Sequence, residues 1–593
     1  MRRNGIRLRH ERIAGVNGDP RSSARLAVQQ HPRDAMAWVV LSDLELDAGD
    51  AAAGEQAARQ ALALAPGHPE ALARLGRAAW MQGDAPLAIR SLRAAHDAVP
   101  AHPGFAVWYA HLLEEHGDAE DAARMYEHAY GLMPDNAQLA DYLLAWRRRL
   151  CDWRDLDALS RQVRSAVREG SASPEPFAFL SEDATPAEQL ACARLRATQV
   201  ARVVRPLPPP TIASRGARAR VGFLSNGFGA HPTGLLTAAM FEHLHARGGI
   251  EVSLFALSPD DGSDIRRRLA DASTLVDVSA DGHDRIARRI RDAGIEVLVD
   301  LRGWGGGGAP GVLAQRPAPV QVNWLAFPGT SGAPWIDYLV ADRFVLPPER
   351  QGDFSEAVAW LPRCFQPSDT RRAIPPPPSR ETCGLPAQGV VFCCFNNSYK
   401  LNPRSMSRAF SILRGVPGSV LWLLSGPGRA DERLREAAMA AGIDETRLVF
   451  MRKQPHAEYL ARLRLADLFL DTNPYNAHTT ASDALWAGCP LLTSPGTTFA
   501  SRVAGSLNHH LGLDAMNVTG DTAFVQRAIE LATAPGALAA LRTDLVARRD
   551  TAPLFDMPGF AADFAALLLR MVERHRAGLP PVALEPQPGM RIG

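Results

Sequence analysis

Lysine is almost absent from this chain: Lys400 and Lys453 are the only two among 65 cationic side chains, and the rest are arginines. Such a ratio indicates a genome in which replaceable lysine codons have become arginine codons, so a remaining lysine marks a place where a compact ammonium is needed. Lys400 follows the apolar segment 390–395, a predicted strand, and ligands of α/β sheets bind at strand ends. A point charge there suits a phosphate oxygen. A chance surface lysine is the alternative, and Lys453, beside Arg452, fits that alternative better.

Other absences exclude whole classes of protein. The net charge is +1, and basic patches with interleaved aromatic residues are missing, so we expect no nucleic-acid partner. No apolar run approaches 18 residues, and the basic N-terminus lacks the apolar segment of a signal peptide, so we expect neither a membrane span nor export. The seven cysteines are scattered without CxxC or His/Cys ligand spacing. They predict reduced thiols in a cytoplasmic protein without structural zinc.

A 34-residue period runs through the first quarter of the chain. Prolines recur at 32, 66, 100 and 134, Gly-Asp pairs at 49–50, 83–84 and 117–118, and alanines at 61, 95 and 129. Each period holds two helical patterns, in which the small residues allow close packing and proline stops the second helix. In period and residue type this resembles the tetratricopeptide repeat, whose stacked helix pairs form a superhelix with a groove for extended partner segments.

Two regions of alternating strands and helices follow. After the proline run 206–210, predicted strands at 219–225, 252–258 and 297–303 indicate a doubly wound parallel sheet. A second proline run at 374–379 separates a similar region, with predicted strands at 390–395, 419–425, 447–451, 465–471 and 489–494. Both regions lack GxGxxG after the first strand and GxxxxGK[ST], which argues against a dinucleotide dehydrogenase and a P-loop NTPase. Two such lobes predict a ligand cleft between facing strand ends.

The segment 465–488 is the richest in candidate residues. A strand ends at Asp471, and after a turn-rich loop His478, Thr479 and Thr480 open a helix. Free backbone N–H groups at a helix N-terminus, with hydroxyls beside them, form an anion site. Asp483, one turn further, is placed to accept from a ribose hydroxyl. The equally weighted alternative is an ordinary cap by Thr479 or Thr480.

The first lobe offers a candidate base. His231 directly precedes a helix predicted to begin at Pro232, and the positive helix end disfavours its cationic form. Asp300, at the end of a strand, is the second candidate. The glycine-rich loop 302–311 is equally compatible with a phosphate cradle and with a spacer, and the segment 324–332 is a tight turn at a strand end. A lone loop histidine is more often structural, so that alternative remains.

Together these motifs resemble the protein O-GlcNAc transferase family. The resemblance is carried by AHPTG, WLAFPGTSG, CCFNNSYKLNP, SVLWLLSGP, LADLFLDTNPYNAHTTASDALWAG and PGTTFASRVA, in the family's order, and it extends from about residue 20 to 575. It implies an all-α tetratricopeptide-repeat superhelix followed by an α/β GT-B enzyme of two Rossmann-like lobes. The expected boundaries are repeats at 1–150, a helical linker at 151–210, an N-terminal lobe at 211–376, a C-terminal lobe at 377–555, and a C-terminal helix and tail at 556–593.

The resemblance also implies roles for matching residues. Lys400 would contact the donor diphosphate and stabilise the leaving nucleotide, while His231, or Asp300 in its place, would act as base. The donor site would comprise His478, Thr479 and Thr480 on the phosphates, Asp483 on the ribose, Asn397, Gln454, Tyr459 and Arg462 near the nucleotide, and the turn Phe327, Pro328, Gly329 and Thr330 around the sugar.

The chain departs from the family's animal members at three points. Tyr459 stands where they carry the histidine that stacks on uracil, Asn397 stands where they carry glutamine, and their long insertion between the lobes is absent. Relatives using UDP-glucose or GDP-fucose share much of this frame, so they remain alternative donors to UDP-GlcNAc. A catalytically weak nucleotide-binding scaffold is a further alternative.

We therefore expect an inverting transfer of N-acetylglucosamine from UDP-GlcNAc to Ser or Thr hydroxyls of intracellular proteins, which the repeat groove would hold. No acidic DxD sequence occurs near the phosphate-type loops, so we expect no metal and no cofactor beyond the donor substrate. Lys400 and the helix dipole would take the place of a metal ion.

Overall fold

The structure is a computed structural model that describes residues 19–208 and 218–587. The basic N-terminal stretch and the predicted boundary at 210–211 lie outside the described residues. Two compact units are present. One comprises Met1–Val163 with Gly426–Ala430, and the other comprises Arg164–Ser425 with Asp431–Gly593.

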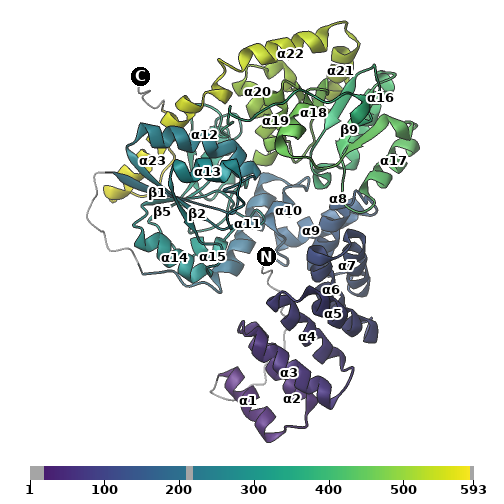
Figure 1. The fold of residues 1–593 in the computed structure, drawn as a ribbon, viewed down its shortest axis with the longest axis vertical. Coiled ribbons are helices and arrows are strands. Elements are labelled where there is room, and N and C mark those ends of the chain that lie inside the picture. The colour runs from purple at the N-terminus through teal and green to yellow at the C-terminus, as the bar shows by residue number, and fades with distance from the viewer. Residues whose placement is uncertain (1–18, 209–217, 588–593) are drawn as a thin grey trace. The chain divides into compact units, whose positions relative to one another are not determined.

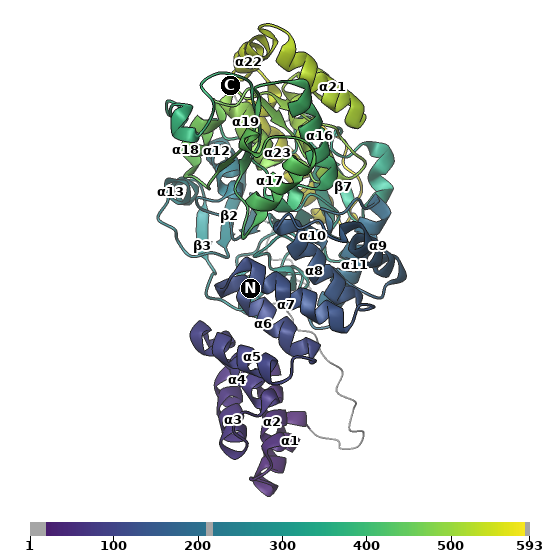
Figure 2. The ribbon, with the colours of Figure 1, turned by 90° about the vertical axis from the view of Figure 1, so that its right-hand side faces the viewer.

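Paired antiparallel helices of nearly constant length form the first unit. They are α1 (Pro20–Gln30), α2 (Ala35–Asp47), α3 (Ala51–Leu64), α4 (Pro69–Gln82), α5 (Ala85–Ala98), α6 (Pro103–His116), α7 (Ala119–Leu132) and α8 (Ala137–Arg149), and Figure 2 shows α1 to α5 stacked in chain order. The predicted tetratricopeptide architecture is confirmed.

The Gly-Asp pairs mark the turn inside each repeat, although Gly117 of the third pair is extended rather than left-handed. Gly83 ends α4 with φ +83°, a left-handed conformation that favours glycine. The next residue, Asp84, caps α5 by accepting from the backbone N–H of Leu87 at 3.0 Å, and Asp50 and Asp118 cap α3 and α7 in the same way. The recurring Ala61, Ala95 and Ala129 are fully buried, as close helix packing requires.

Three helices precede two parallel sheets in the chain: α9 (Leu156–Glu169), α10 (Pro176–Phe179) and α11 (Pro186–Ala201). The boundary between the two units falls within α9. The first sheet has the order β3-β2-β1-β4-β5-β6-β7 and defines the first lobe. Its strands are β1 (Ala219–Ser225), β2 (Ile250–Ala256), β3 (Thr274–Asp277), β4 (Val297–Asp300), β5 (Val320–Asn323), β6 (Tyr338–Ala341) and β7 (Ala357–Trp360), and the helices between them are α12 (Pro232–Arg247), α13 (Asp264–Asp271), α14 (His283–Asp292) and α15 (Pro310–Leu313).

The second sheet has the order β10-β9-β8-β11-β12 and defines the second lobe. Its strands are β8 (Val391–Cys394), β9 (Val420–Leu424), β10 (Leu448–Met451), β11 (Leu468–Leu470) and β12 (Leu491–Leu492). The helices of this lobe are α16 (Pro403–Gly415), α17 (Ala430–Ala440), α18 (His456–Leu463), α19 (Thr479–Ala487), α20 (Val503–His510), α21 (Gly520–Thr533) and α22 (Ala537–Arg548). The predicted pair of α/β lobes is confirmed, whereas the exact domain boundaries remain predictions.

The C-terminal helix α23 (Met557–Arg576) returns to the first lobe. Its Phe564 ring lies 4.3 Å from that of Trp324, and Figure 1 shows α12 and α23 on the side of the first sheet opposite to α14 and α15. Beyond α23, Leu584 pairs with the edge strand β7 through hydrogen bonds to Val358 and Trp360. The first lobe is thus completed by the last part of the chain.

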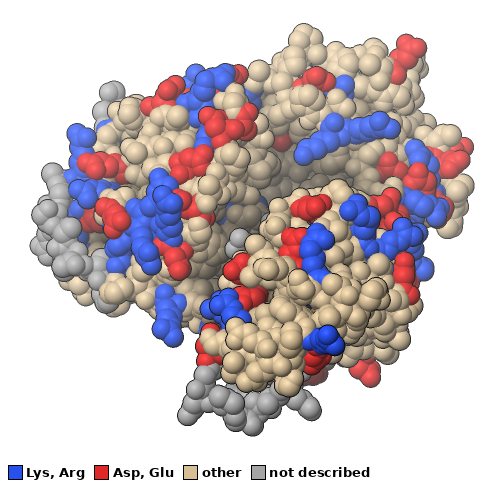
Figure 3. Space-filling view, turned by 60° about the horizontal axis from the view of Figure 1, so that its bottom comes forward, with Lys and Arg blue, Asp and Glu red and all other residues tan. Residues whose placement is uncertain are grey.

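Charges of both signs are mixed on the face of the protein drawn in Figure 3, which agrees with the net charge of +1. Within the described ranges, none of the helices has both the length and the apolar character needed to cross a bilayer.

The repeats make a testable prediction about packing. A Cβ at Gly76, on α4, would lie 2.6 Å from Cγ of Leu92 on α5. We expect Gly76→Ala to lower the stability of the repeats by about 1 kcal/mol or more, because a close-packed helix pair must move apart. Thermal unfolding followed by circular dichroism measures the change.

Gly131, on α7, is the matched control, because a Cβ there meets nothing within 4 Å. Gly131→Ala should hold or raise the unfolding midpoint by the gain in helix propensity, up to about 1 kcal/mol. Equal midpoints for the two variants would contradict the assigned packing.

Candidate active site

The candidate side chains lie at the carboxyl ends of both sheets. In the first lobe, His231 follows β1, Asp300 ends β4, and the turn 327–330 follows β5. In the second lobe, Lys400 follows β8, residues 454–462 follow β10, and α19 follows β11. Since the carboxyl ends of parallel strands meet at one edge of a sheet, each lobe gathers its candidates at one edge.

Lys400 is buried, with 7% of its surface exposed. Its Nζ donates to the backbone carbonyl of Asn476 at 2.7 Å and lies 3.7 Å from the centre of the Tyr475 ring. Burial lowers the pKa of Lys400 to about 7, although Asp471 and Cys394 act in the opposite direction. The ammonium is held by a dipole and an aromatic face, which leaves its charge available to an anion. The alternative of a chance surface lysine is thereby excluded.

Asp471 organises the loop that leads to α19. Its Oδ1 accepts from the backbone N–H of Thr472 at 2.8 Å and of Ala477 at 2.7 Å, and its Oδ2 accepts from the Thr493 hydroxyl at 2.7 Å. Burial raises the pKa of Asp471 to about 6, while these hydrogen bonds and Lys400 oppose the rise. The carboxylate therefore fixes the loop in a compact form beneath the helix end.

The N-terminus of α19 lacks a side-chain cap. The helix begins at Thr479, and His478 occupies the capping position without a side-chain hydrogen bond to the first turn. Instead, His478 Nε2 lies 3.0 Å from the carbonyl of Ala500, and burial keeps the pKa of His478 well below its usual value. The predicted alternative of a cap by Thr479 or Thr480 is therefore wrong, and the first-turn N–H groups remain available to an anion.

Asp483 lies one turn into α19 and is already paired on one oxygen. Its Oδ1 accepts from Nη1 of Arg372 at 2.5 Å and lies 3.2 Å from Nε2 of His456. Neither partner could be singled out from the sequence, because Arg372 lies beyond the first lobe's sheet and His456 is at the start of α18. The role of Asp483 on a ribose remains a prediction.

The residues predicted to surround the nucleoside differ in exposure and contacts. Asn397 is exposed, and Gln454 donates to the carbonyl of Arg452 at 3.1 Å. Arg462 contacts the Glu458 carboxylate at 3.2 Å along α18. The Tyr459 hydroxyl is buried and has no hydrogen-bond partner among the described residues, and burial raises its pKa well above the usual value.

His231 caps α12 in the first lobe. Its Nδ1 accepts from the backbone N–H of Thr233 at 3.2 Å, so the proton of the neutral ring is on Nε2. The pKa of His231 falls to about 4, chiefly through burial and then through the charges of Arg302 and Lys453. The predicted neutral state is supported, but its main cause is burial rather than the helix end. Lys453, expected to be an unrelated surface residue, is exposed yet within electrostatic reach of His231.

Asp300 is buried beside the same loop, with 5% of its surface exposed. Its Oδ1 accepts from the backbone N–H of Arg302 at 2.9 Å, and burial raises its pKa. A carboxylate with a raised pKa is a stronger base, but this one is enclosed by its own loop. In the neighbouring turn, the Thr330 hydroxyl donates to Glu356 at 2.6 Å, so it braces the turn from within.

The glycine-rich loop is closely packed. Gly303 has φ +50°, and a Cβ there would lie 2.7 Å from Cβ of Phe327. Gly307 has φ +76°, and a Cβ there would lie 1.9 Å from Nδ2 of Asn226. Backbone conformation and packing account for these two glycines without a phosphate.

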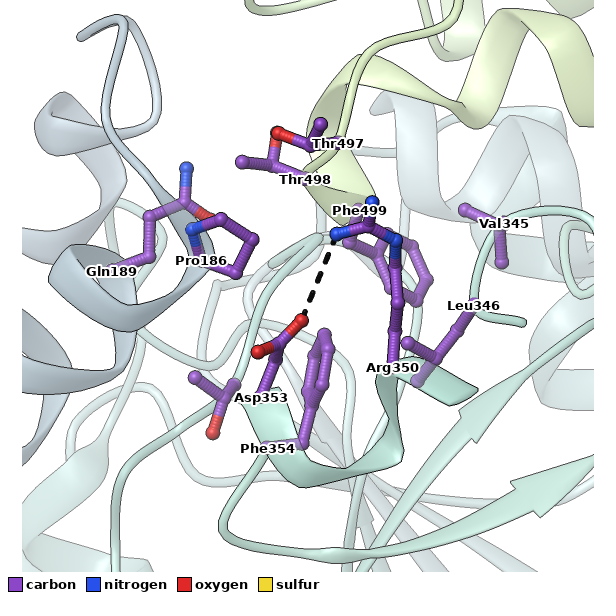
Figure 4. Close-up of a pocket in the computed structure, with 11 residues that line it drawn as sticks. Pro186, Gln189, Val345, Leu346, Arg350, Asp353, Phe354, Thr497, Thr498 and Phe499 are labelled. Carbon is purple, nitrogen blue, oxygen red and sulfur yellow. Dashed lines mark ion pairs between the residues drawn. The ribbon is translucent and has the colours of Figure 1, made fainter. Parts of the chain in front are cut away.

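Figure 4 shows a pocket that includes one residue of the turn 327–330 in its lining. Its lining comprises Pro186, Gln189, Thr330, Val345, Leu346, Arg350, Asp353, Phe354, Thr497, Thr498 and Phe499. Arg350 and Asp353 form an ion pair at 3.8 Å across it. Thr330 is the one predicted site residue in the lining, so the pocket does not coincide with the surroundings of Lys400 and α19.

Across residues 19–208 and 218–587, no three His, Cys, Asp or Glu side chains converge as metal ligands would. Metal independence of the reaction remains a prediction.

The geometry of His231 leads to a spectroscopic prediction. With its pKa near 4, the ring should stay neutral between pH 5.5 and 8, and the Thr233 hydrogen bond should hold it in the Nε2–H tautomer. Nuclear magnetic resonance of histidine labelled with ¹⁵N and ¹³C measures both, and the signal absent from His231→Ala identifies the residue. Titration within this range, or the Nδ1–H tautomer, would contradict the assigned geometry.

Comparison with known proteins places these features in a family. The model of glycosyl transferase family 41 matches residues 207–376 and 377–564, and a tetratricopeptide-repeat model matches 12–69, 39–103 and 73–137. The chain is 34% identical over 455 residues to the Arabidopsis thaliana protein named probable UDP-N-acetylglucosamine–peptide N-acetylglucosaminyltransferase SEC, covering 73% of this chain and 46% of that protein. For the Caenorhabditis elegans UDP-N-acetylglucosamine–peptide N-acetylglucosaminyltransferase, the identity is 29% over 479 residues, covering 62% and 42%.

A solved structure of a mutant Thermobaculum terrenum O-GlcNAc transferase is similar over 95% of this chain and 99% of its own, with a TM-score of 0.67 and 25% identity. The chain spans less than half the length of the two curated relatives. The two-lobed fold and the family match together show that this chain, with its tetratricopeptide repeats, belongs to glycosyl transferase family 41.

Proposed function

We propose that this chain transfers N-acetylglucosamine from UDP-GlcNAc to Ser or Thr hydroxyls of proteins, with inversion at the sugar C1. The observation that carries the proposal is the pairing of a buried ammonium, Lys400, with the uncapped N-terminus of α19. A charge and a set of free N–H groups at one edge of a sheet are what a diphosphate needs. The names of the full-length relatives favour this donor and this acceptor class.

In this proposal the donor lies along the edge of the second lobe. The diphosphate contacts Lys400, His478, Thr479 and Thr480, and the ribose contacts Asp483. Since the pKa of His478 is far below neutral, this residue contributes a neutral ring that shapes the site. Asn397, Gln454, Tyr459 and Arg462 surround the base, and the turn 328–330 borders the sugar.

The reaction joins the acceptor oxygen to C1 and breaks the bond from C1 to the phosphate oxygen. The bonding electrons leave with UDP, and the hydroxyl proton passes to a base. Negative charge develops on the departing diphosphate, where Lys400 and the dipole of α19 stabilise it more strongly than in the ground state. Positioning and charge neutralisation therefore supply most of the catalysis.

The identity of the base depends on the tautomer of His231. With Nδ1 occupied by Thr233, the nitrogen free to face a ligand is Nε2–H, which donates a hydrogen bond and accepts no proton. His231 is then suited to donate to a sugar or phosphate oxygen, and it becomes a base only if the Thr233 bond breaks. Asp300 has the raised pKa of a base but must open its loop to reach a substrate.

The repeats are proposed to hold the protein acceptor. Tetratricopeptide repeats bind extended segments of partner proteins in their concave groove. We propose the cytoplasm as the location, since intracellular thiols remain reduced, and Cys364, Cys393 and Cys394 are free and buried.

Removal of the Lys400 ammonium tests the donor site. Lys400→Ala should weaken UDP-GlcNAc binding about 10- to 100-fold, because a charge-assisted hydrogen bond contributes about 1.5–3 kcal/mol. Turnover should fall further, since the charge on the leaving group grows in the transition state. Calorimetry with UDP, UDP-GlcNAc, UDP-glucose and GDP-fucose, in EDTA, measures donor choice and metal dependence together.

Repeating the same titrations at several pH values provides a control for the role of the Lys400 charge. Since the pKa of free Lys400 is about 7, wild-type affinity should fall as pH rises from 7 to 9 and the ammonium loses its proton. The affinity of Lys400→Ala should stay flat over this range. Unchanged binding and turnover in the variant would contradict the assignment of Lys400 to the diphosphate. If the wild type prefers GDP-fucose or UDP-glucose, that nucleotide sugar is the donor instead of UDP-GlcNAc.

The two candidates for the base are separated by matched substitutions. His231→Gln retains an N–H donor but cannot accept a proton, so it should retain clearly more activity than His231→Ala. Loss of a transition-state donor typically lowers kcat by about 10²–10³-fold. If both variants lose activity equally while UDP affinity is kept, His231 is the base. If Asp300→Asn alone abolishes turnover at unchanged affinity, Asp300 is the base.

A further inference from the structure

Arg372 is a buried arginine outside the residues assigned above. It lies in the segment that leads from the last strand of the first sheet, β7, to the first strand of the second, β8. Its side chain is 1% exposed. An arginine that is nearly always charged is seldom placed in such an environment unless its guanidinium is fully engaged.

The guanidinium is engaged on each of its nitrogens. Nη1 donates to Oδ1 of Asp483 at 2.5 Å, Nη2 donates to the Ser482 hydroxyl at 3.2 Å, and Nε donates to the backbone carbonyl of Asp369 at 2.7 Å. Nε thus anchors the arginine to its own segment, while both terminal nitrogens act on neighbouring residues of α19.

The contacts of Asp483 are divided unequally between its oxygens. Oδ1 accepts the hydrogen bond from Nη1 of Arg372 and lies 3.2 Å from Nε2 of His456. No hydrogen bond from a described residue reaches Oδ2. Asp483 is 4% exposed, and a carboxylate this deeply buried requires a countercharge. Arg372 supplies that countercharge through Nη1, and its Nη2 holds the adjacent Ser482 hydroxyl, so the carboxylate is fixed at Oδ1.

We propose that Arg372 is a positioning residue for nucleotide recognition, which holds Asp483 so that Oδ2 accepts from the ribose hydroxyls of the donor. This inference rests on the proposed function, because it assigns the ribose of a uridine nucleotide to Asp483. It adds that recognition of the ribose diol depends on a residue from the segment between the lobes.

A purely structural role is the competing explanation. The same segment is joined to α19 by the contact between the Ser368 and Ser482 hydroxyls at 2.9 Å, and the Trp486 indole donates to the carbonyl of Arg372 at 3.0 Å. If Arg372 served only to hold these elements together, its loss would weaken every ligand alike. Orientation of Asp483 would instead affect only ligands that carry the ribose hydroxyls.

The experiment compares UDP with 2′,3′-dideoxy-UDP, which lacks both hydroxyls, by calorimetry. Wild type should prefer UDP by about 10- to 100-fold, equivalent to about 1.4–2.7 kcal/mol. In Arg372→Met, UDP should lose nearly the whole of this preference, binding about 10- to 100-fold more weakly while dideoxy-UDP binds nearly as in wild type, so that discrimination falls below about threefold. Arg372→Lys, which restores a charge, should recover part of the discrimination.

Ser368→Ala is the matched control, because it removes a contact between the same segment and α19 without touching Asp483. It should retain the wild-type discrimination. Equal weakening of both nucleotides in Arg372→Met, or equal loss of discrimination in Ser368→Ala, overturns the inference while leaving the proposed function intact. Failure of wild type to bind any uridine nucleotide overturns the proposed function and the inference with it.

Discussion

Burial of the Lys400 ammonium is the constraint on which the site depends. Transfer of a cation from water into the protein interior is costly, and here a carbonyl dipole, the face of Tyr475 and the charge of Asp471 offset only part of that cost. The lowered pKa of Lys400 expresses the remaining deficit. In the function proposed here, a diphosphate beside Lys400 stabilises the ammonium, so part of the cost of its burial becomes favourable binding free energy. The loop that Asp471 organises fixes the ammonium, because it carries the Asn476 carbonyl to which Lys400 donates.

The elements around Lys400 are organised on the same basis, with backbone dipoles and fixed charges directed at one edge of the second sheet. The helix end at Thr479 is free because His478 is turned toward Ala500, and Asp483 is oriented because Arg372 is anchored to Asp369. The start of α19 keeps its first N–H groups free, and Asp483 keeps Oδ2 free, because their partners bind other atoms. Such preorganisation reduces the rearrangement that binding and reaction require.

Much of this architecture could be predicted from the sequence, because it follows from local patterns. The 34-residue period determines the helix pairs, and the Gly-Asp pairs determine their turns. Lys400 could be singled out because lysine is rare in this chain. The partners of Asp483 could not be predicted, since Arg372 is 111 positions away and packing alone brings the two together. The tautomer of His231 could not be predicted, and the sequence left a free and a capped start of α19 equally weighted, because each depends on one hydrogen bond rather than on a residue pattern.

The path of the chain's last residues bears on how the protein is made. The strands of the first sheet all precede residue 361, yet α23, which covers one side of that sheet together with α12, begins at Met557, and Leu584 supplies the final pairing to the edge strand. During synthesis the second lobe therefore leaves the ribosome complete while the first still exposes an apolar face and an open strand edge. A chaperone that protects the nascent chain would find its binding surface on the lobe that was translated first.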